Sequence, residues 1–399
     1  MAQMAASVAP PLQVPQRLLL GPGPSNINPR VLRAMSAPAL GYLDPTWMQT
    51  MDEIAAMLRA LFRTRNDLCI AMPGTGTAGM ETAIANLVEP GDVVVVGTHG
   101  FFGERLAEIA RRYGATVATV PGEWGRPLDP DAVEAELRKH PKVKALGVVH
   151  AETSTGVLQP LEALSALARR YDCLLIVDAV TSLGGSPVEV DAWGIDFCYS
   201  ASQKCLGCPP GLAPVTVSPR AEQAIARRTQ KVRSFYLDLT LHRSYWGGPR
   251  LYHHTAPVNL LYGLHEGLRL ILEEGLEARW ERHRRVARAL WAGLEALGLR
   301  LLVAEAHRTP QLTTVVLPEG VDEMKLRRTL LDEWGIEVGG GLGALRGKIL
   351  RIGLMGENAT PSAVLTLLCA LEALLPRLGY EVPPGAGTAA AGRVLAGGG

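Results

Sequence analysis

The stretch LLIVDAVTSLGG, at residues 174–185, says most about the fold of this chain. Four apolar residues run without interruption into Asp178, a pattern typical of a strand that is buried on both faces. Similar runs, separated by helical patterns, lie at 68–72, 93–97, 116–120, 145–150, 197–200 and 214–218. Apolar strands that alternate with helices predict an α/β domain built on a mostly parallel, seven-stranded sheet between layers of helices.

The pattern changes near Ala278, where a charged helix is followed by shorter strands and helices. The segments LTTVVLP, IEVGGG and ILRIGLM alternate with helices predicted at 322–334 and 361–375, which indicates a smaller α+β domain with an antiparallel sheet. The two ends of the chain are rich in Ala, Pro and Gly and have little to bury. We therefore expect an N-terminal arm at 1–17, a large domain at 18–277, a small domain at 278–380 and a disordered tail at 381–399.

The composition is that of a globular protein with a balanced charge. The 399 residues include 47% hydrophobic and 20% charged residues, and the formal net charge is +1. Such a chain has no strongly charged surface to attract nucleic acid or anionic lipid, so small molecules are the expected partners. The Arg-rich run at 279–288 is interpreted as the solvated face of a helix, because Trp280, Val286 and Leu290 form an apolar stripe beside it.

The sequence also predicts where the protein resides. No apolar run reaches the roughly 20 residues of a membrane helix, and residues 1–20 lack the basic start and apolar core of a signal peptide. The C-terminal RVLAGGG differs from the S-K-L peroxisomal signal. Six scattered cysteines are too few to hold a chain of this length together, so we expect reduced thiols and a cytoplasmic protein with no membrane contact.

Asp178 and Lys204 together point to a cofactor. Lys204 lies in YSASQKCLG (199–207), among small and polar residues that suit a crowded ligand site. Pyridoxal phosphate (PLP) needs a carboxylate to keep its pyridine nitrogen protonated and an amine to form a Schiff base with its aldehyde. Both residues follow predicted strands, and open α/β sheets bind ligands at the carboxyl ends of their strands. Asp178 alone would be read as a turn cap, but the pair predicts a PLP site.

The segment MPGTGTAGMETAIANL (72–87) offers a phosphate site between a strand and a helix. Backbone N–H groups at the start of the helix can bind phosphate, with the hydroxyls of Thr75 and Thr77 as further donors. Its glycines also match the G-x-G-x-x-G of dinucleotide-binding folds, but the next strand, VVVVGTHG, lacks the acidic residue expected at its end. A monophosphate cradle is favoured, while dinucleotide binding and a purely structural turn stay open.

A set of motifs covers nearly the whole chain, from Gly21 to about Leu375. In order they are GPGPSN (21–26), GTGT (74–77), HAETSTGVLQPL (150–161), VDAVTSLGG (177–185), SASQKCL (200–206), YHHT (252–255) and LRIGLMGENAT (350–360). Together they resemble the alanine–glyoxylate / serine–pyruvate aminotransferase family, which are class-V aminotransferases of the fold-type I PLP group. The resemblance implies a large PLP-binding domain, a smaller C-terminal domain and a homodimer.

The resemblance also implies roles for matching residues around the cofactor. Lys204 would be the Schiff-base lysine and proton carrier, and Asp178 would pair with the pyridinium nitrogen. Phe102 would stack on the ring, and Thr153 would hydrogen-bond near its phenolic oxygen. The phosphate would be held by Thr75, Gly76, Thr77 and Gln203.

Further roles concern the substrate and the second subunit. The resemblance implies that Arg351 binds the substrate carboxylate, a task that suits the geometry of a guanidinium group, and that Gly23 lies beside the substrate. It also implies that Tyr252 and Thr255 contact the phosphate bound by the neighbouring subunit.

No metal site is expected from the sequence. Cys205 and Cys208 have metal-like spacing, but no second pair of ligands follows at a suitable distance. His253 and His254 could be ligands or bases, yet the side chains of adjacent residues tend to diverge, so we expect local packing. Arg351 could also form a structural ion pair if the resemblance is ignored.

These observations predict an aminotransferase that acts on a small amino acid, L-alanine or L-serine, with glyoxylate or pyruvate as acceptor, most of all an alanine–glyoxylate aminotransferase. Serine–glyoxylate or hydroxykynurenine transamination, or a desulfurase-like reaction, would use the same residues in a pocket of different shape. An NAD-dependent oxidoreductase depends on the glycine pattern alone. A non-catalytic binding protein of the same fold would be expected to have lost Lys204 or Arg351, and both are present.

Overall fold

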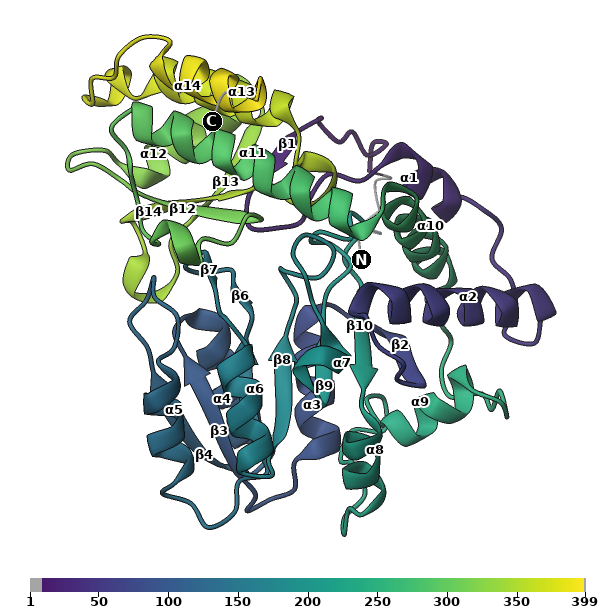
Figure 1. Cartoon of the computed structure of the whole chain (residues 1–399). Helices are drawn as coiled ribbons and strands as arrows, with labels where there is room; N and C mark the ends of the chain where they lie inside the picture. The colour runs from purple at the N-terminus through teal and green to yellow at the C-terminus, as the bar shows by residue number, and fades with distance from the viewer. Residues whose placement is uncertain (1–8, 398–399) are drawn as a thin grey trace, which may run out of the picture.

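The computed structural model describes residues 9–397 and contains two large sheets, one above the other in Figure 1. The lower sheet has seven strands in the order β2 (Leu68–Pro73), β10 (Leu212–Val217), β9 (Phe197–Tyr199), β8 (Leu174–Asp178), β5 (Ala145–Val149), β3 (Val93–Thr98) and β4 (Thr116–Pro121). All neighbours pair in parallel except at β10, which is antiparallel to both β2 and β9. The seven apolar runs of the sequence form these strands, so the predicted sheet is confirmed.

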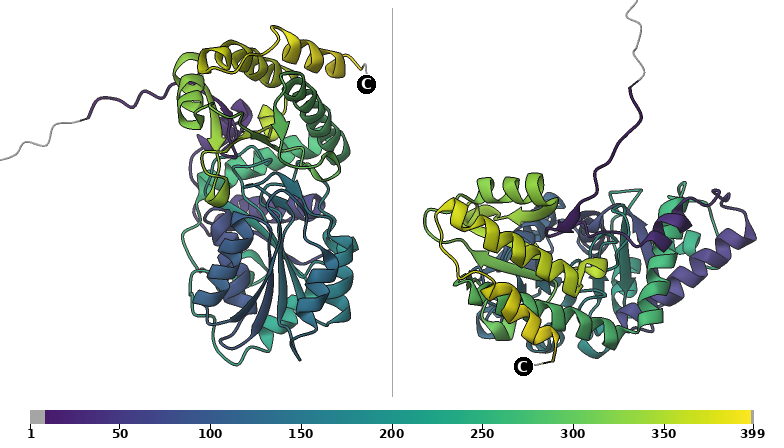
Figure 2. Two further views of the ribbon diagram at one scale, coloured as in Figure 1. Left: turned by 90° about the vertical axis from the view of Figure 1, so that its left-hand side faces the viewer. Right: turned by 90° about the horizontal axis from the view of Figure 1, so that it is seen from above.

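Helices lie on both faces of this sheet (Figure 2). They are α2 (Pro45–Phe62), α3 (Gly76–Leu87), α4 (Phe101–Arg112), α5 (Pro130–Leu137), α6 (Glu162–Arg170), α7 (Val190–Trp193) and α8 (Pro219–Ala226). Three of them begin with a capping residue and a proline: Asp44, Asp129 and Ser218 each accept a backbone N–H and are followed by a proline at the first helical position.

The upper sheet has five strands and lies in the smaller domain. The order is β1 (Leu18–Leu20), β13 (Ile336–Gly340), β14 (Ile349–Gly353), β12 (Leu312–Val316) and β11 (Arg300–Leu301), and only β1 and β13 pair in parallel. Its helices are α11 (Leu276–Ala296), α12 (Glu323–Trp334), α13 (Pro361–Leu374) and α14 (Ala386–Leu395). Side chains from the sheet and these helices form one apolar core, as expected for the α+β domain.

Three further α-helices and a hairpin complete the described elements of the large domain and its border with the small one. They are α1 (Pro29–Met35), α9 (Leu239–Trp246), α10 (Val258–Glu274) and the pair β6 (Ala151–Glu152) and β7 (Val157–Leu158). α10 packs against α1, α2 and α11, and this places it beside both domains (Figure 1). Among residues 9–397, none of the helices combines the length and the apolar character that a membrane crossing needs.

The first departure from the sequence analysis is strand β1. We placed residues from 18 onward in the large domain, but Leu18–Leu20 pair with Ile336–Val338 at the edge of the small sheet, and Leu20 is fully buried there. Three residues are too short to show a strand period, and their partner is remote in sequence. Of the predicted arm, residues 9–17 form neither helix nor strand, and 1–8 lie outside the described residues.

The second departure is the predicted tail. Residues 386–395 form α14, which packs against α11 and α13; residues 398–399 lie outside the described range. The interface is unusually close, because a Cβ atom on Gly387 would lie 3.1 Å from the carbonyl oxygen of Gly293. An Ala- and Gly-rich helix buries little area per residue, but its small side chains allow this close approach. The division of the chain near residue 277 is kept as a proposal.

Candidate functional site

The residues predicted to form the site converge on one edge of the seven-stranded sheet. Because β8 and β9 are parallel neighbours, with Asp178 opposite Tyr199, the segment that follows β9 brings Lys204 to the same edge as Asp178. Thr153 follows β5, Phe102 follows β3, and Gly76 follows β2 in the same direction. The carboxyl ends of parallel strands are where ligands bind in open α/β sheets.

Asp178 is held in one orientation at the end of β8. Its Oδ1 accepts the Val180 N–H at 2.8 Å, and its Oδ2 accepts the hydroxyl of Tyr199 at 3.0 Å. The side chain is buried, and burial raises the pKa of Asp178 to about 7. A carboxylate in this position gains from a cationic partner, since an opposite charge lowers the cost of its burial. Tyr199 was not predicted from the sequence as a site residue, although its place on the next parallel strand was a signal.

Lys204 is a buried amine at the junction of the two domains. Its Nζ donates a hydrogen bond to the carbonyl of Pro22. Burial lowers the pKa of Lys204 to about 8, and the charge of Arg351 acts in the same direction. Gly23 lies against this side chain: it has φ +111, and a Cβ there would come within 2.8 Å of Lys204 Nζ. Only glycine fits both the backbone conformation and the space.

Arg351 reaches the same region from the small domain. It lies on β14, where its Nε donates to the carbonyl of Gly340 at 2.7 Å and its Nη1 to the carbonyl of Thr153 at 3.0 Å. Burial lowers the pKa of Arg351 to about 10, with Glu152 opposing that shift, so the guanidinium stays charged at neutral pH. Both hydrogen bonds of the Arg351 guanidinium go to backbone carbonyls, and no carboxylate among the described residues forms an ion pair with it, so the structural ion pair that the sequence left open is not observed there.

The glycine-rich segment forms the start of helix α3. Gly76 is the first helical residue and Thr75 its N-cap, and the Thr75 side chain does not cap the helix. A Cβ on Gly76 would lie 2.8 Å from Val180, so the helix start is pressed against the segment that follows Asp178. Thr77 is exposed and accepts a hydrogen bond from Arg105 at 3.0 Å. Free N–H groups, hydroxyls and a cation suit an anion at this helix start.

Gln203 also indicates that a ligand binds beside Lys204. Its Oε1 atom, an acceptor, is buried and has no hydrogen-bond partner among the described residues, and such an atom is costly unless a donor group of a ligand or a water completes it. Its backbone carbonyl accepts the Ser25 N–H at 3.0 Å. The residues present therefore fit a phosphate-bearing cofactor with a cationic ring: a helix start with polar neighbours for the phosphate, and a buried carboxylate for the ring.

Phe102 and Thr153 border the same space. Phe102 is half-buried at the start of α4, with the Arg105 guanidinium 4.8 Å from the centre of its ring. Thr153 is buried, and its hydroxyl lies 2.5 Å from that of Thr181. Glu152 fixes both segments, because its carboxylate accepts the backbone N–H groups of Phe102 at 3.2 Å and of Ser154 at 3.0 Å. No role for Glu152 was predicted from the sequence.

Tyr252 and Thr255 lie on the surface between α9 and α10. Both are exposed, and their hydroxyls are 3.2 Å apart. The ring of Tyr252 contacts those of Tyr42 and Tyr245, at centroid distances of 4.9 Å and 6.5 Å. Tyr252 and Thr255 are therefore neighbours on the surface, and Tyr252 packs against two other tyrosine rings there.

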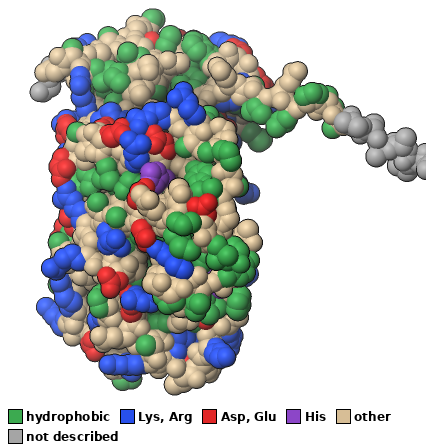
Figure 3. All heavy atoms as spheres, turned by 90° about the vertical axis from the view of Figure 1, so that its right-hand side faces the viewer, with side chains coloured by type: hydrophobic (Ala, Val, Ile, Leu, Met, Phe, Trp, Pro, Cys, Tyr) green, Lys and Arg blue, Asp and Glu red, His purple; other side chains and the backbone are tan. Residues whose placement is uncertain are grey.

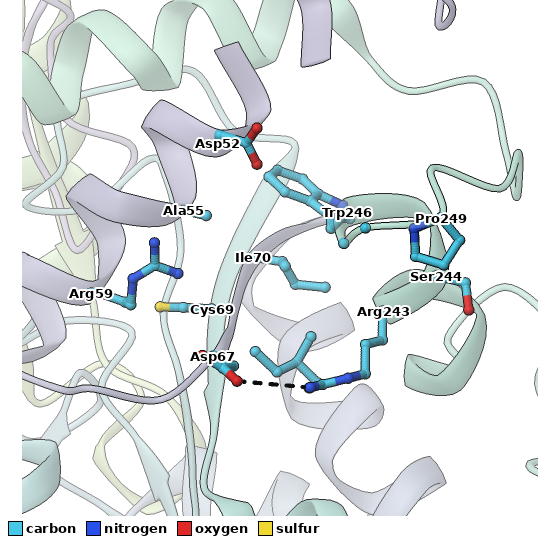
Figure 4. Close-up of a pocket in the computed structure, with 13 residues that line it drawn as sticks. Asp52, Ala55, Arg59, Asp67, Cys69, Ile70, Arg243, Ser244, Trp246 and Pro249 are labelled. Carbon is cyan, nitrogen blue, oxygen red and sulfur yellow. Dashed lines mark ion pairs between the residues drawn. The ribbon is translucent and has the colours of Figure 1, made fainter. Parts of the chain in front are cut away.

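A separate hollow lies at the amino end of β2 (Figure 4). It is lined by residues of α2, β2 and α9, and an ion pair of 3.9 Å joins Asp67 to Arg243 across it. None of the residues predicted for the site lines this hollow. Because Leu68 begins β2 and the predicted site follows its end, the hollow lies at the opposite edge of the sheet.

Comparison with known proteins assigns the family. The model of the family Aminotransferase class-V matches residues 18–358. The chain belongs to the class-V aminotransferases. Members of this family are PLP enzymes, so PLP is the cofactor of this aminotransferase, and the dinucleotide alternative for the glycine-rich segment is set aside. The family resemblance and the fold-type I architecture predicted from the sequence are confirmed.

Individual relatives are similar to this chain over most of its length. This class-V aminotransferase is 46% identical over 354 residues to alanine–glyoxylate aminotransferase of Callithrix jacchus, covering 88% of this chain and 85% of that one. The crystal structure of alanine–glyoxylate aminotransferase from Nostoc sp. has a TM-score of 0.91 and 52% identity, covering 92% of this chain and 98% of that one. The structure of ureidoglycine–glyoxylate aminotransferase from Bacillus subtilis has a TM-score of 0.95 and 43% identity, covering 97% and 100%.

Proposed function

We propose that this aminotransferase transfers the amino group of a small L-amino acid, alanine or serine, to glyoxylate or pyruvate, with alanine and glyoxylate as the preferred pair. The observation that carries the proposal is the meeting of two buried cations, Lys204 and Arg351, at the edge of the sheet that bears Asp178. One is an amine that can exchange a proton, and the other is a fixed charge suited to a carboxylate. The names of the relatives supply glyoxylate as the acceptor.

PLP, when bound, supplies an aldehyde that captures the amino group and a protonated ring that accepts the electron pair left at Cα. We assign Asp178 to the ring nitrogen, because a buried carboxylate that is already oriented by Tyr199 and Val180 can hold a proton there. Phe102 is assigned to the face of the ring, and Thr153 to the neighbourhood of its phenolic oxygen. Thr75, Gly76, Thr77 and Gln203 are assigned to the phosphate.

Lys204 is assigned to proton transfer at the substrate Cα. Its lowered pKa leaves a substantial neutral fraction in mildly alkaline solution, and a neutral amine can accept a proton. The contact with Pro22 and the close fit of Gly23 restrict the positions that the side chain can occupy. Restricting the amine in this way lowers the entropy lost on reaching the reactive geometry.

Arg351 is assigned to the carboxylate that amino acids and 2-oxo acids share. Its two hydrogen bonds to backbone carbonyls orient the guanidinium without neutralising it. Gly23, which lies against Lys204, is assigned to the wall of the substrate space.

A second candidate activity is the transfer of an amino group from (S)-ureidoglycine to glyoxylate. It is favoured by the similarity to the Bacillus subtilis enzyme, which extends over 97% of this chain. Ureidoglycine carries a ureido group in place of the methyl group of alanine, so it needs hydrogen-bond partners that alanine does not. Serine–glyoxylate and hydroxykynurenine transamination remain further alternatives.

A substrate comparison tests the proposal. The PLP-loaded protein would be incubated with glyoxylate and with L-alanine, L-serine, (S)-ureidoglycine or hydroxykynurenine, and glycine and the keto acid product would be quantified. We expect the highest kcat/KM with alanine. A higher value with ureidoglycine would replace the preferred donor by the second candidate. A protein that binds PLP and converts none of these donors would contradict the proposed activity.

We also propose a homodimer in the cytoplasm, in which Tyr252 and Thr255 contact the phosphate site of the other subunit. The proposal is supported by large apolar side chains left exposed near these residues, including Tyr42, Leu43 and Leu251. Figure 3 shows patches of hydrophobic side chains between charged ones on one face of the molecule. An oligomer would cover such patches. The cytoplasmic location is inferred from the sequence alone.

A further inference from the structure

Three histidines converge where the segment 252–255 meets helix α9. His242 lies on α9, and His253 and His254 follow it; one ring nitrogen of each lies within 4.8 Å of those of the other two. The ring centroids are 4.5 Å apart for His242 and His253, and 5.1 Å for His242 and His254. From the sequence we expected adjacent histidines to diverge. A bend at His254 instead brings the Nδ1 atoms of His253 and His254 to 2.9 Å.

Backbone carbonyls fix the orientation of two of these rings. The Nε2 of His242 lies 2.8 Å from the carbonyl of Tyr236, and the Nε2 of His253 lies 3.0 Å from that of Phe235. A carbonyl only accepts, so both Nε2 atoms carry the hydrogen and both Nδ1 atoms of the neutral rings carry a lone pair. Metal-binding histidines are held in the same way, with one ring N–H donated to a carbonyl while the other nitrogen faces the ion.

One nitrogen of the cluster lacks a partner within residues 9–397. The Nδ1 of His242 is buried and has no hydrogen-bond partner among the described residues. The Nδ1 of His254 can donate to that of His253, but this bond leaves His242 Nδ1 unsatisfied. A hydrogen-bonded histidine cluster therefore accounts for only part of the arrangement.

We propose that His242, His253 and His254 bind a zinc-class divalent cation through their Nδ1 atoms, with water as the fourth ligand. On binding, His254 would carry its hydrogen on Nε2 and free a third lone pair. Three imidazoles without a carboxylate favour zinc and its first-row neighbours over Mg²⁺ or Ca²⁺, which prefer oxygen ligands. Zn–N bonds of about 2.0–2.1 Å in a tetrahedron put the nitrogens about 3.4 Å apart. In this cluster the Nδ1 atoms of His253 and His254 are 2.9 Å apart, and the three ligand nitrogens all lie within 4.8 Å of one another.

The position of the site gives it a structural role. A bound ion would link His242 on α9 to His253 and His254. These two residues lie between Tyr252 and Thr255 in the chain. His253 and His254 are each 9% exposed, whereas His242 is fully buried, so an ion can enter from the surface side. The site shares no residue with the Lys204 region, and its existence does not depend on the proposed substrate.

Metal analysis of the full-length, PLP-loaded protein tests this inference. The protein would be stripped with a chelator, loaded with Zn²⁺ alone, desalted and analysed for zinc per chain. The variants would be His242→Gln and His254→Gln, since Gln keeps a polar side chain of similar reach. The matched control is His265→Gln, because His265 is outside the cluster and pairs with Glu53 at 2.7 Å.

We expect about one zinc per chain in the wild type and in His265→Gln. Removing His242 or His254 should weaken binding by at least the 10–100-fold that is typical of losing a supporting partner of a metal ligand. The variants keep the PLP site and the buried cysteines of the wild type. Zinc that remains bound to a variant is therefore bound outside the histidine cluster. Equal zinc content in the wild type and His242→Gln would overturn the proposal.

X-ray absorption at the zinc edge provides a test that does not depend on how the variants fold. In the zinc-loaded wild type, we expect nitrogen ligands at about 2.0–2.1 Å with the multiple-scattering signature of imidazole, while sulfur at about 2.3 Å would assign the metal to cysteine and overturn the proposal. Hydrogen exchange gives a further readout. Zinc should slow exchange within residues 239–255 of the wild type, and an unchanged rate there would contradict the cross-link.

Discussion

At the scale of single residues, Lys204 is the side chain whose burial is hardest to explain by stability alone. An amine at this depth is disfavoured in its charged form, as its lowered pKa shows. We expect Lys204→Ala to abolish transamination while PLP still binds, because Asp178 and the start of α3 remain. The measurement is keto acid production together with the visible spectrum of the bound cofactor. Lys325→Ala, at an exposed position on α12, is the control, and a near-normal rate in the Lys204 variant would contradict the assignment.

Arg351→Ala tests carboxylate binding. Truncating one partner of a buried, charged hydrogen-bond pair costs about 2–5 kcal/mol, which corresponds to at least a roughly 30-fold rise in KM. The rise should affect the amino acid and the 2-oxo acid alike, since both present a carboxylate. Steady-state kinetics with each substrate varied in turn measure it. Arg351→Lys keeps a charge but not the forked donors, and we expect an intermediate KM; unchanged values in the alanine variant would contradict the role.

Asp178 predicts an unusual pH dependence for the cofactor-free protein. Its pKa of about 7 in the folded state exceeds the roughly 3.9 of an unfolded chain. Between these values the folded state holds a proton that the unfolded state has released, so the free energy of unfolding should fall as pH rises. From pH 5.5 to pH 7 the free energy of unfolding should fall by roughly 1.6 kcal/mol, because the full slope of about 1.36 kcal/mol per unit is halved when the pH reaches the folded pKa.

Denaturant titrations at a series of pH values would measure this effect. Asp178→Asn does not titrate, so its unfolding free energy should lack this contribution, and the difference from the wild type should grow toward pH 7. Parallel pH profiles for the two proteins would show that the Asp178 carboxyl is not responsible. The comparison requires protein freed of PLP, because a cationic ring would stabilise the carboxylate.

The site residues that could be predicted from the sequence are ionisable residues in apolar surroundings. Asp178 and Lys204 stand out because ionisable residues follow apolar runs. Glu152 and Tyr199 were missed because their importance comes from what they touch: Glu152 accepts the N–H groups of Phe102 and Ser154, and Tyr199 reaches Asp178 from the adjacent strand. The convergence of His242 with His253 and His254 depends in the same way on tertiary contacts.

At the scale of elements, glycines set how closely helix α4 approaches strand β3. A Cβ on Gly103 would lie 2.4 Å from the carbonyl oxygen of Gly97. Gly103→Ala should therefore displace α4, lower the unfolding free energy by about 1–3 kcal/mol and weaken PLP binding through the adjacent Phe102. Chemical denaturation and cofactor titration measure the two effects.

Gly392→Ala is the matched comparison. Gly392 lies within α14, and a Cβ there would meet nothing within 4 Å. Replacing a helical glycine by alanine should stabilise the protein by up to about 1 kcal/mol. If the Gly103 variant were stabilised to the same extent, close packing of α4 on β3 would be refuted as the reason for its glycine.

Element prediction succeeded where hydrophobic periodicity is strong. The seven apolar runs became the seven strands of the large sheet, and the helices expected at 322–334 and 361–375 became α12 and α13 within a residue at each end. It failed where pairing depends on a remote partner or on small side chains. β1 is three residues long and pairs with β13, while α14 is rich in Ala and Gly, which hydrophobicity rules read as a tail.

At the scale of the whole molecule, the proposed exchange of Tyr252 and Thr255 between subunits can be tested by complementation. A subunit with Lys204→Ala would be co-expressed with one that carries Tyr252→Ala and Thr255→Ala. If the sites are shared, each mixed dimer contains one intact site, formed by Lys204 of one chain and Tyr252 of the other. Activity should then exceed that of either parent homodimer.

If each site is instead built within one chain, the mixed dimer has no intact site. Its activity would equal the average of the two parents, and the shared-site proposal would fail. The oligomeric state is checked on the same preparations by light scattering. A monomeric wild type would also contradict the proposal.

The pairing of β1 with β13 has a consequence for how the protein is made. Leu18 pairs with Ile336, so roughly 320 residues must be translated before the first strand meets its partner. At about 5–20 residues per second, this takes some 15–60 s on the ribosome. During that time the large sheet can form, while the segment that places Pro22 and Gly23 beside Lys204 has no sheet to join. The nascent chain would therefore complete its cofactor-binding sheet before its substrate wall, and the small domain would close last.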